Sequence, residues 1–276
     1  MAPSDANHTI AFVGGGTMAE AILARLVAEG GTPADRIRVG EPIAERRQVI
    51  ADTYGILAFG DNAEAVSGAD MVILAIKPQV LVPALGELRG VLDSETLVLS
   101  IVAGATIAQI HALLSIETIV RAMPNTPGQI GEGATVWVAT EQTSQAQRDL
   151  AGGVLELLGL AIEVHEERYL NMATALSGSG PAYVFLFVEA MVEAGVRLGF
   201  ARSVAERLAL QTVRGAAIYA QETGLSPAEL RARVTSPGGT TAEGLYQLER
   251  GGLRASVLEA VQAAYQRANE LGRSKA

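Results

Sequence analysis

Hydrophobic and polar positions follow two alternating patterns over the first part of the chain. Short apolar runs rich in β-branched residues have the length of buried strands, and segments with the apolar spacing of helices separate them. These runs predict strands over residues 9–13, 37–39, 56–59, 71–76, 97–102, 118–122, 133–139 and 161–165. Strands that alternate with helices are typical of an α/β fold. The pattern therefore predicts a doubly wound sheet domain over residues 1–165.

From residue 166 onward only the helical spacing remains. It predicts helices over residues 169–176, 181–198, 203–222, 227–234, 240–249 and 253–271. Between the first two, Ser177 or Ser179 is suited to cap a helix and Pro181 is suited to its first position. We therefore expect an all-helical second domain over residues 166–276, with a helix that begins near Pro181.

The helix expected over residues 181–198 is apolar nearly all round. Its charged residues Glu189, Glu193 and Arg197 follow one another at spacings of four and form a single polar stripe. An almost wholly apolar helix must be buried on almost every side, and the remaining helical segments are too short to cover it. This predicts a homodimer in which each helical domain completes the core of the other.

Composition and charge narrow the class of protein. Hydrophobic residues make up 49% of the chain and charged residues 18%, below the usual share of about 25%, which agrees with subunit burial. Lys77 or Glu189 interrupts the apolar runs before the ~20 residues of a membrane span, so no membrane association is expected. The start of the chain lacks a secretory signal pattern and cysteine is absent, which predicts a cytoplasmic protein. A net charge of −9 without a basic cluster predicts no nucleic-acid partner, and no residues have metal-ligand spacing.

A glycine turn directly follows the first predicted strand. Gly14, Gly16 and Ala19 have the G-x-G-x-x-A spacing, and Thr17 and Met18 begin the helical pattern after it. Such a turn is tight, brings backbone N–H groups to a pyrophosphate at the helix start, and allows close packing of helix and strand. This context favours a dinucleotide-binding site of the Rossmann type over an ordinary glycine turn.

The end of the second predicted strand bears on the choice of nicotinamide cofactor. Glu41 lies about 20 residues beyond the turn, where an acidic side chain would accept hydrogen bonds from the adenosine ribose of NAD. Arg46 and Arg47 follow within the next turns and would suit the 2′-phosphate of NADP, or they are solvated helix charges. The residues leave both NADH and NADPH open.

Two further loops are expected beside this site, because ligands of open α/β sheets bind beyond the carboxyl ends of the strands. Lys77 and Pro78 follow the strand over residues 71–76. Asn125 lies between Pro124 and Pro127, in a stiff loop that either carries a donor into the cleft or is a plain proline turn.

One loop of the helical part, over residues 234–241, is more than a short connection between two helices. It is either a helix start capped by Thr240 or Thr241, or an anion site made of free N–H groups. Residues 166–274 contain no His, Lys or Cys. His and Lys are the residues that most often exchange the hydroxyl proton of the substrate in alcohol dehydrogenases. A protonated C=N bond needs mainly positioning and exclusion of water, so imine reduction is favoured over alcohol oxidation.

Five motifs in order resemble those of the pyrroline-5-carboxylate reductase family, which catalyses the last step of proline synthesis. They cover residues 12–19, 75–79, 121–127, 175–183 and, most specifically, 234–241, so the resemblance extends over essentially the whole chain. It implies reduction of 1-pyrroline-5-carboxylate to L-proline with NADPH or NADH. It also implies a Rossmann domain followed by a helical domain that interlocks in a homodimer, often assembled further.

Site residues are carried over by position. The expected cofactor contacts, which include Glu41 and Asn125 from the arguments above, are Gly14, Gly16, Thr17, Met18, Glu41, Asn62, Ala75, Lys77, Pro78 and Asn125. Glu41 differs from the small or polar residue expected for NADP preference. The substrate carboxylate is expected on Ser236, Gly238, Gly239, Thr240 and Thr241, with Thr241 as the catalytic hydroxyl near the imine nitrogen.

Two alternatives remain. A related imine or 3-hydroxy-acid dehydrogenase is one, although the hydroxy-acid enzymes place a lysine on the helix after the junction and residues 181–198 contain none. The other is a non-catalytic dinucleotide sensor, which would bind cofactor without turning over a cyclic imino acid.

Overall fold

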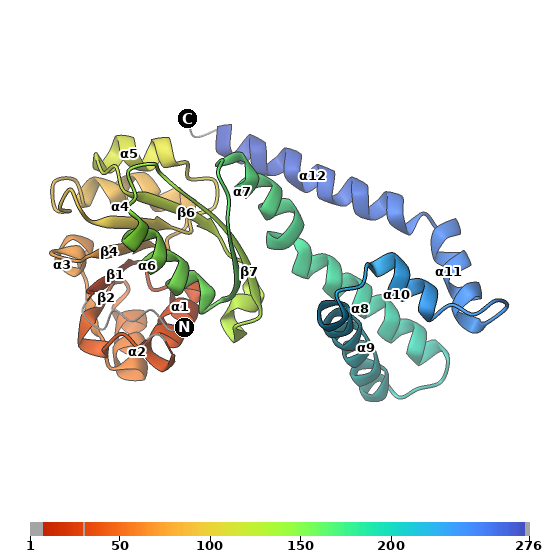
Figure 1. Ribbon diagram of the computed structural model, residues 1–276. Coiled ribbons are helices and arrows are strands. Elements are labelled where there is room, and N and C mark those ends of the chain that lie inside the picture. Colours follow the sequence, from red (N-terminus) through yellow and green to blue (C-terminus); the bar gives the residue numbers. More distant parts are fainter. Residues whose placement is uncertain (1–7, 30, 274–276) are drawn as a thin grey trace. The chain divides into compact units, whose positions relative to one another are not determined.

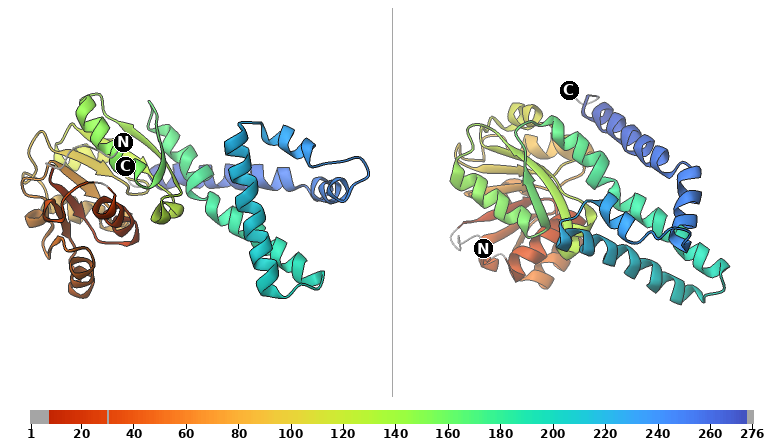
Figure 2. Two further views of the ribbon diagram at one scale, coloured as in Figure 1. Left: turned by 60° about the horizontal axis from the view of Figure 1, so that its bottom comes forward. Right: turned by 45° about the vertical axis from the view of Figure 1, so that its right-hand side comes forward.

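The computed structural model describes residues 8–29 and 31–273 (Figures 1 and 2). The described residues form two compact units. One contains the chain up to Ser179 together with the residues from Ala264 onward, and the other is Gly180–Ala263. The first unit thus includes residues 166–179 and the end of the chain, beyond the boundary expected after residue 165. The division into a cofactor-binding part up to residue 165 and a substrate-binding part after it stays a prediction.

The first unit is built on one eight-stranded sheet. Its order is β3-β2-β1-β4-β5-β6-β7-β8, and neighbouring strands are parallel except for the antiparallel pair β6–β7. The strands are β1 (Ile10–Val13), β2 (Ile37–Gly40), β3 (Leu57–Phe59), β4 (Met71–Leu74), β5 (Leu97–Ser100), β6 (Ile119–Met123), β7 (Gly133–Ala139) and β8 (Gly159–Glu163). The first six have the strand order of a dinucleotide-binding fold, which confirms the predicted doubly wound sheet.

Helices cover both faces of the sheet (Figures 1 and 2). One buried cluster joins α1 (Thr17–Ala28), α2 (Ala44–Tyr54) and α6 (Gln145–Glu156) to side chains such as Phe12, Ile73 and Leu99. A second joins α3 (Asn62–Val66), α4 (Leu81–Glu87) and α5 (Ile107–Leu114) to the alternate side chains such as Val13, Val72 and Val98. Successive residues of a strand point to opposite faces, so β1, β4 and β5, which are buried throughout, are continuous apolar runs. The edge strands β3 and β8 are partly exposed.

Two helices and one strand differ from the sequence prediction. The sequence analysis did not identify α4 and α5, because both are short and α4 contains Pro83 and Gly86. Pro83 is tolerated because it lies in the first turn, where its missing N–H has no helical partner. The last strand begins at Gly159, two residues before the predicted start. Gly159 has φ +124°, and an added Cβ would lie 2.4 Å from the carbonyl oxygen of Gly133, so the glycine lies within the sheet edge rather than in a turn.

The stretch around Ser177 is itself helical, and the next helix begins at Gly180, one residue before the predicted start near Pro181. α7 (Arg168–Ala173), a π-helical segment (Thr174–Gly178) and α8 (Gly180–Arg197) follow one another. The Ser177 hydroxyl donates to the carbonyl oxygen of Ala173 at 3.0 Å, and the Ser179 N–H donates to Thr174 O at 2.8 Å. The predicted capping role of Ser177 is therefore wrong, because its hydroxyl is bonded inside the π-helical segment. Ser179 lies between this segment and α8, and its capping role stays a prediction.

The joined helical run Arg168–Arg197 is long and apolar enough, by length and composition alone, to cross a membrane. Glu189, the residue expected to interrupt it, lies within this run, but one charge does not remove the apolar character of the joined helix. A long apolar helix with little burial inside one chain is equally suited to burial against another subunit.

The second unit consists of helices around a small core. α9 (Arg202–Thr223), α10 (Pro227–Arg233), α11 (Thr240–Arg250) and the first part of α12 (Leu253–Arg273) accompany α8. Its buried core is limited to Val192, Ala205 and Ala209. Large apolar side chains of α8 remain exposed, among them Phe185 at 60% and Leu186 at 68%. The exposed apolar faces agree with the expectation that one chain does not complete this core.

Candidate active site

The glycine turn follows β1 and contacts the carboxyl ends of the neighbouring strands β2 and β4. Gly14 has φ +95°, a conformation that favours glycine, and its N–H donates to the carbonyl oxygen of Gly40 at 2.9 Å. An added Cβ on Gly14 would lie 2.7 Å from the Ile76 side chain and 3.0 Å from the Ala75 carbonyl oxygen. The structure therefore places Gly14 against Ala75, and only glycine fits between them.

The start of α1 fits a pyrophosphate. The helix begins at Thr17 after Gly16, and no side chain caps it. Gly16 and Thr17 are exposed, and an added Cβ on Gly16 would have no atom closer than the Ala75 carbonyl oxygen at 4.0 Å. Uncapped N–H groups at the start of a 12-residue helix attract an anion, and the bare glycine surface lets it approach. Met18 is half-buried and packs on the core below this surface.

Glu41 is turned toward the glycine turn. Its side chain is buried, with 8% of the residue exposed. One carboxylate oxygen accepts from the Gly15 N–H at 3.0 Å, and the other accepts from the Ile43 N–H at 2.9 Å. Gly15 lacks space for a side chain, since an added Cβ would lie 2.4 Å from Ile50. Sequence spacing predicts the position of Glu41, but it gives no signal for the hydrogen bond from the Gly15 N–H.

The two arginines of α2 are half-buried, and both are hydrogen-bonded to the backbone of the turn. Arg46 donates through Nε to the carbonyl oxygen of Gly15 at 2.8 Å and pairs with the carboxylate of Glu20. Arg47 donates to the carbonyl oxygen of Glu41 at 2.8 Å. The hydrogen bond from Arg46 lowers the pKa of Glu20, and burial together with Glu20 raises the pKa of Tyr54, whose hydroxyl donates to Glu20 at 3.1 Å. The arginines thus hold the turn, a role that sequence spacing did not distinguish from phosphate binding.

Asn62 lies beside the end of β2. It is the first residue of α3, and Asp61 rather than Asn62 caps that helix by accepting from the N–H groups of Ala63 and Glu64. An added Cβ on Gly40 would lie 2.4 Å from the Asn62 amide oxygen. The Asn62 amide also donates to Glu87 at 3.1 Å. Asn62 is therefore brought next to the Gly40–Glu41 turn, as the predicted cofactor site requires.

Lys77 and Pro78 lie at the carboxyl end of β4. Lys77 precedes a short 3₁₀ helix (Pro78–Val80) that has Pro78 at its first position. The Lys77 side chain is exposed. β4 is the neighbour of β1 in the sheet, so this loop and the glycine turn share one sheet edge.

Asn125 makes two hydrogen bonds within the protein through its side-chain amide. Its amide nitrogen donates to the carbonyl oxygen of Ser177 at 2.9 Å, and its amide oxygen accepts from the Ala134 N–H at 2.8 Å. The loop after β6 is thus tied to the π-helical segment and to β7. One N–H of the amide serves Ser177 and the second is not used in these two bonds, so the role of Asn125 as a cofactor contact stays a prediction.

The loop over residues 234–241 forms a turn before α11. Gly238 has φ +67°, and the Gly239 N–H donates to the carbonyl oxygen of Ser236 at 3.0 Å. Gly239 precedes α11 and no side chain caps the helix, so neither Thr240 nor Thr241 is a capping residue. Ser236, Gly238, Thr240 and Thr241 are exposed in the helical unit. Uncapped N–H groups and three hydroxyls beside them can bind a carboxylate.

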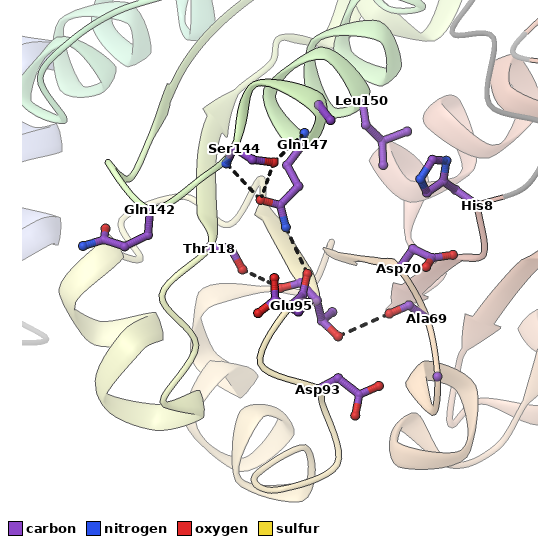
Figure 3. A pocket seen from close by; sticks show the side chains of 13 residues that line it. His8, Ala69, Asp70, Asp93, Glu95, Thr118, Gln142, Ser144, Gln147 and Leu150 are labelled. Atoms are coloured by element: carbon purple, nitrogen blue, oxygen red, sulfur yellow. Dashed lines mark hydrogen bonds between the residues drawn. The ribbon is translucent and has the colours of Figure 1, made fainter.

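A pocket of about 380 Å³ lies at the opposite edge of the sheet (Figure 3). His8, Asp70, Glu95 and Thr118 line it, and these residues precede β1, β4, β5 and β6. Ligands of this fold bind beyond the carboxyl ends of the strands. The pocket at the amino ends is therefore separate from the predicted cofactor site.

The fold and the uncapped glycine turn define the class, a Rossmann-type nicotinamide oxidoreductase. Residues 9–104 match the family model "NADP oxidoreductase coenzyme F420-dependent", and residues 167–271 match "Pyrroline-5-carboxylate reductase dimerisation". The helical part of the chain therefore contains a dimerisation domain.

Named relatives match the full length. The chain is 43% identical to a pyrroline-5-carboxylate reductase of Synechocystis sp., over 96% of this chain and 98% of that protein. A solved pyrroline-5-carboxylate reductase structure from Coxiella burnetii is 40% identical with TM-score 0.91, over 96% and 99% of the two chains. One from Plasmodium falciparum, with NADP bound, is 28% identical with TM-score 0.86, over 96% and 98%. The chain belongs to the pyrroline-5-carboxylate reductase family.

Proposed function

We propose that this chain reduces Δ1-pyrroline-5-carboxylate to L-proline with NADPH or NADH as the hydride donor. The observation that carries the proposal is the agreement, over nearly the whole length of both chains, with relatives that bear this activity in their names. A nicotinamide cofactor supplies the hydride, and the chain supplies binding, orientation and a hydrogen bond to the reacting nitrogen.

The sheet unit binds the cofactor in this proposal. The N–H groups at the start of α1, from Thr17 and Met18, hold the pyrophosphate over the bare surface of Gly16, where the structure leaves space. Gly14, Ala75, Lys77 and Pro78 form the adjoining sheet edge, and Glu41 with Asn62 forms the adenosine side. Asn125 contributes by fixing the loop after β6, since its amide is bonded within the protein.

The helical unit binds the substrate. The N–H groups of Gly238 and Thr240 and the Ser236 hydroxyl hold the substrate carboxylate, because an anion is stabilised at an uncapped helix start. Gly239 shapes the turn through the hydrogen bond from its N–H to Ser236. The C=N nitrogen of the substrate arrives with its proton. When the bound cofactor supplies a hydride to the ring carbon, the π electron pair would become the lone pair of the amine nitrogen, and the Thr241 hydroxyl would donate a hydrogen bond to that lone pair as it forms.

The assembly is part of the proposal. A homodimer through the helical unit covers the exposed apolar faces of α8, and further association of dimers gives a larger oligomer. This burial accounts for the apolar run Arg168–Arg197 without a membrane. The active protein works in the cytoplasm, without a nucleic-acid partner or a metal.

The test is a reaction of the purified protein with Δ1-pyrroline-5-carboxylate and either NADH or NADPH in parallel. Oxidation of the nicotinamide with matching formation of proline is the expected result. Saturable cofactor binding without proline from either cofactor would instead favour a dinucleotide sensor and overturn the proposal.

A further inference from the structure

The cofactor-binding edge carries a negative charge that is fixed in place. Glu41 directly follows β2, and both of its carboxylate oxygens accept backbone N–H groups, from Gly15 at 3.0 Å and from Ile43 at 2.9 Å. The residue is 8% exposed. Rotating the side chain away would leave two backbone donors of the turn without their partner, which costs free energy. The carboxylate therefore stays beside the glycine turn when a ligand arrives.

The nearby cations are already engaged. Arg46 bonds the carbonyl oxygen of Gly15 and the carboxylate of Glu20, and Arg47 bonds the carbonyl oxygens of Glu41 at 2.8 Å and Pro42 at 3.4 Å. Lys77 comes from the loop after β4, and β1 lies between β4 and β2 in the sheet. These hydrogen bonds fix both guanidinium groups against the backbone of the turn, on the side where Glu41 lies.

A carboxylate in this position discriminates between the two nicotinamide cofactors. An ionised carboxylate has about four lone-pair sites, so after accepting two N–H groups it can still accept ribose hydroxyls. NADP carries a phosphate on the 2′-oxygen in place of the hydroxyl, and like charges at close range in a partly buried site repel strongly. The same side chain that bonds the ribose of NADH thus opposes the phosphate of NADPH.

We propose that Glu41 makes this chain select NADH over NADPH. The proposal rests on the proposed function only for the use of a nicotinamide cofactor. It goes beyond the proposed function by naming one of the two cofactors, and it assigns Arg46 and Arg47 to holding the turn.

The experiment is an equilibrium titration of NADH and NADPH against the whole protein without substrate. We expect the chain to bind NADH more tightly than NADPH by about tenfold or more, which corresponds to about 1.4 kcal/mol. Glu41→Ser should move the ratio of the two dissociation constants toward NADPH by about tenfold. Glu41→Gln, which keeps the shape and one acceptor oxygen, should move the ratio in the same direction and serves if Glu41→Ser does not fold.

The matched control is Glu45→Gln, which removes an exposed carboxylate from the first turn of α2. It should leave the ratio unchanged. Tighter binding of NADPH by the unaltered protein overturns the proposal. So does an equal loss of both cofactors in the two Glu41 variants, since this would show that Glu41 only supports the turn. Binding of NADH without proline formation would overturn the proposed function alone, and binding of neither cofactor would overturn both.

Discussion

The side-chain amide of Asn125 donates to the carbonyl oxygen of Ser177 at 2.9 Å, across 52 positions of sequence. The helical partner of that carbonyl would be residue 181, which is a proline and has no N–H. Asn125 thus supplies the hydrogen bond that Pro181 removes. The long helix can continue through a proline because a side chain from the loop after β6 satisfies the freed acceptor.

Replacing Asn125 should therefore destabilise the sheet unit. Asn125→Ala leaves both Ser177 O and Ala134 N–H without this partner, and Asn125→Asp keeps the acceptor but loses the donor. We expect each to lower the free energy of unfolding by about 1–3 kcal/mol, measured by urea denaturation. Gln145→Ala is the control, because its amide bonds Asp149 on the surface, and it should change stability by less than about 0.5 kcal/mol. Equal effects in all three variants would contradict this account.

Two glycines of the cofactor turn should respond differently to substitution. Gly16 has φ −71° and space for a side chain, so Gly16→Val should fold normally yet lose nicotinamide cofactor binding, because the branched side chain occupies the surface where the pyrophosphate approaches. Gly14→Val should instead destabilise the fold, since Gly14 has φ +95° and an added Cβ meets Ile76 at 2.7 Å. Thermal unfolding and cofactor titration separate the two outcomes. Unchanged affinity in Gly16→Val would mean that the turn does not bind the cofactor.

The Glu20–Arg46 pair predicts a pH dependence of stability. The pKa of Glu20 is lowered by the hydrogen bond from Arg46, so the native state binds fewer protons than the unfolded state. The contribution of the pair is complete above the ordinary pKa of about 4.3 and is lost as the pH falls through the lowered value. Glu20→Gln should cost about 0.5–1 kcal/mol at neutral pH, and this difference should shrink under acid conditions in urea denaturation. A difference that is independent of pH would show that the charge of Glu20 is irrelevant.

Thr241 should affect turnover more than cofactor affinity. Its side chain is exposed in the helical unit and caps no helix, so removing the hydroxyl should leave the fold intact. Thr241→Ala should lower kcat about tenfold or more, the loss of one hydrogen bond of about 1.4 kcal/mol in the transition state. Thr241→Ser keeps the hydroxyl and should retain most of the rate. Equal losses in the two variants would assign Thr241 a packing role.

The apolar face of α8 should be the subunit interface. Phe187 is 42% exposed in the single chain and lines an apolar groove of about 620 Å³ with Tyr183 and Val257. Phe187→Asp should dissociate the dimer and lower stability together, because an unpaired buried carboxylate costs several kcal/mol, about 3 or more. Glu189→Gln on the polar stripe of the same helix is the control. Sedimentation that finds a stable native monomer of the unaltered protein would contradict the prediction.

The sequence predicted the sheet well because its central parallel strands β1, β4 and β5 are buried on both faces and are apolar runs. The glycine turn was equally predictable, since its spacing reflects local backbone needs at Gly14 and Gly16. Short helices were harder to predict. The pattern of α4 is interrupted by Pro83 and Gly86, and the π-helical segment at residues 174–178 depends on a partner, Asn125, that lies far away in sequence.

Side-chain direction was the least predictable part of the candidate site. Spacing indicated that Glu41, Arg46 and Arg47 lie near the adenosine side, but their partners are backbone groups of the folded turn. A hydrogen bond to the Gly15 N–H exists only after β1 and β2 have paired. Sequence periodicity carries no signal for such contacts, because they depend on tertiary geometry and not on local preference.

The discontinuity of the sheet unit has a consequence for how the chain matures on the ribosome. Residues from Ala264 onward pack with the sheet, where Asn269 accepts from Asn171 at 2.9 Å and Ala268 is buried. Domains generally fold as units during synthesis, beginning at the amino end. Here the contacts that residues 264–273 make with the sheet unit can form only after the whole helical unit has been synthesised. These long-range contacts are therefore among the last that the sheet unit gains.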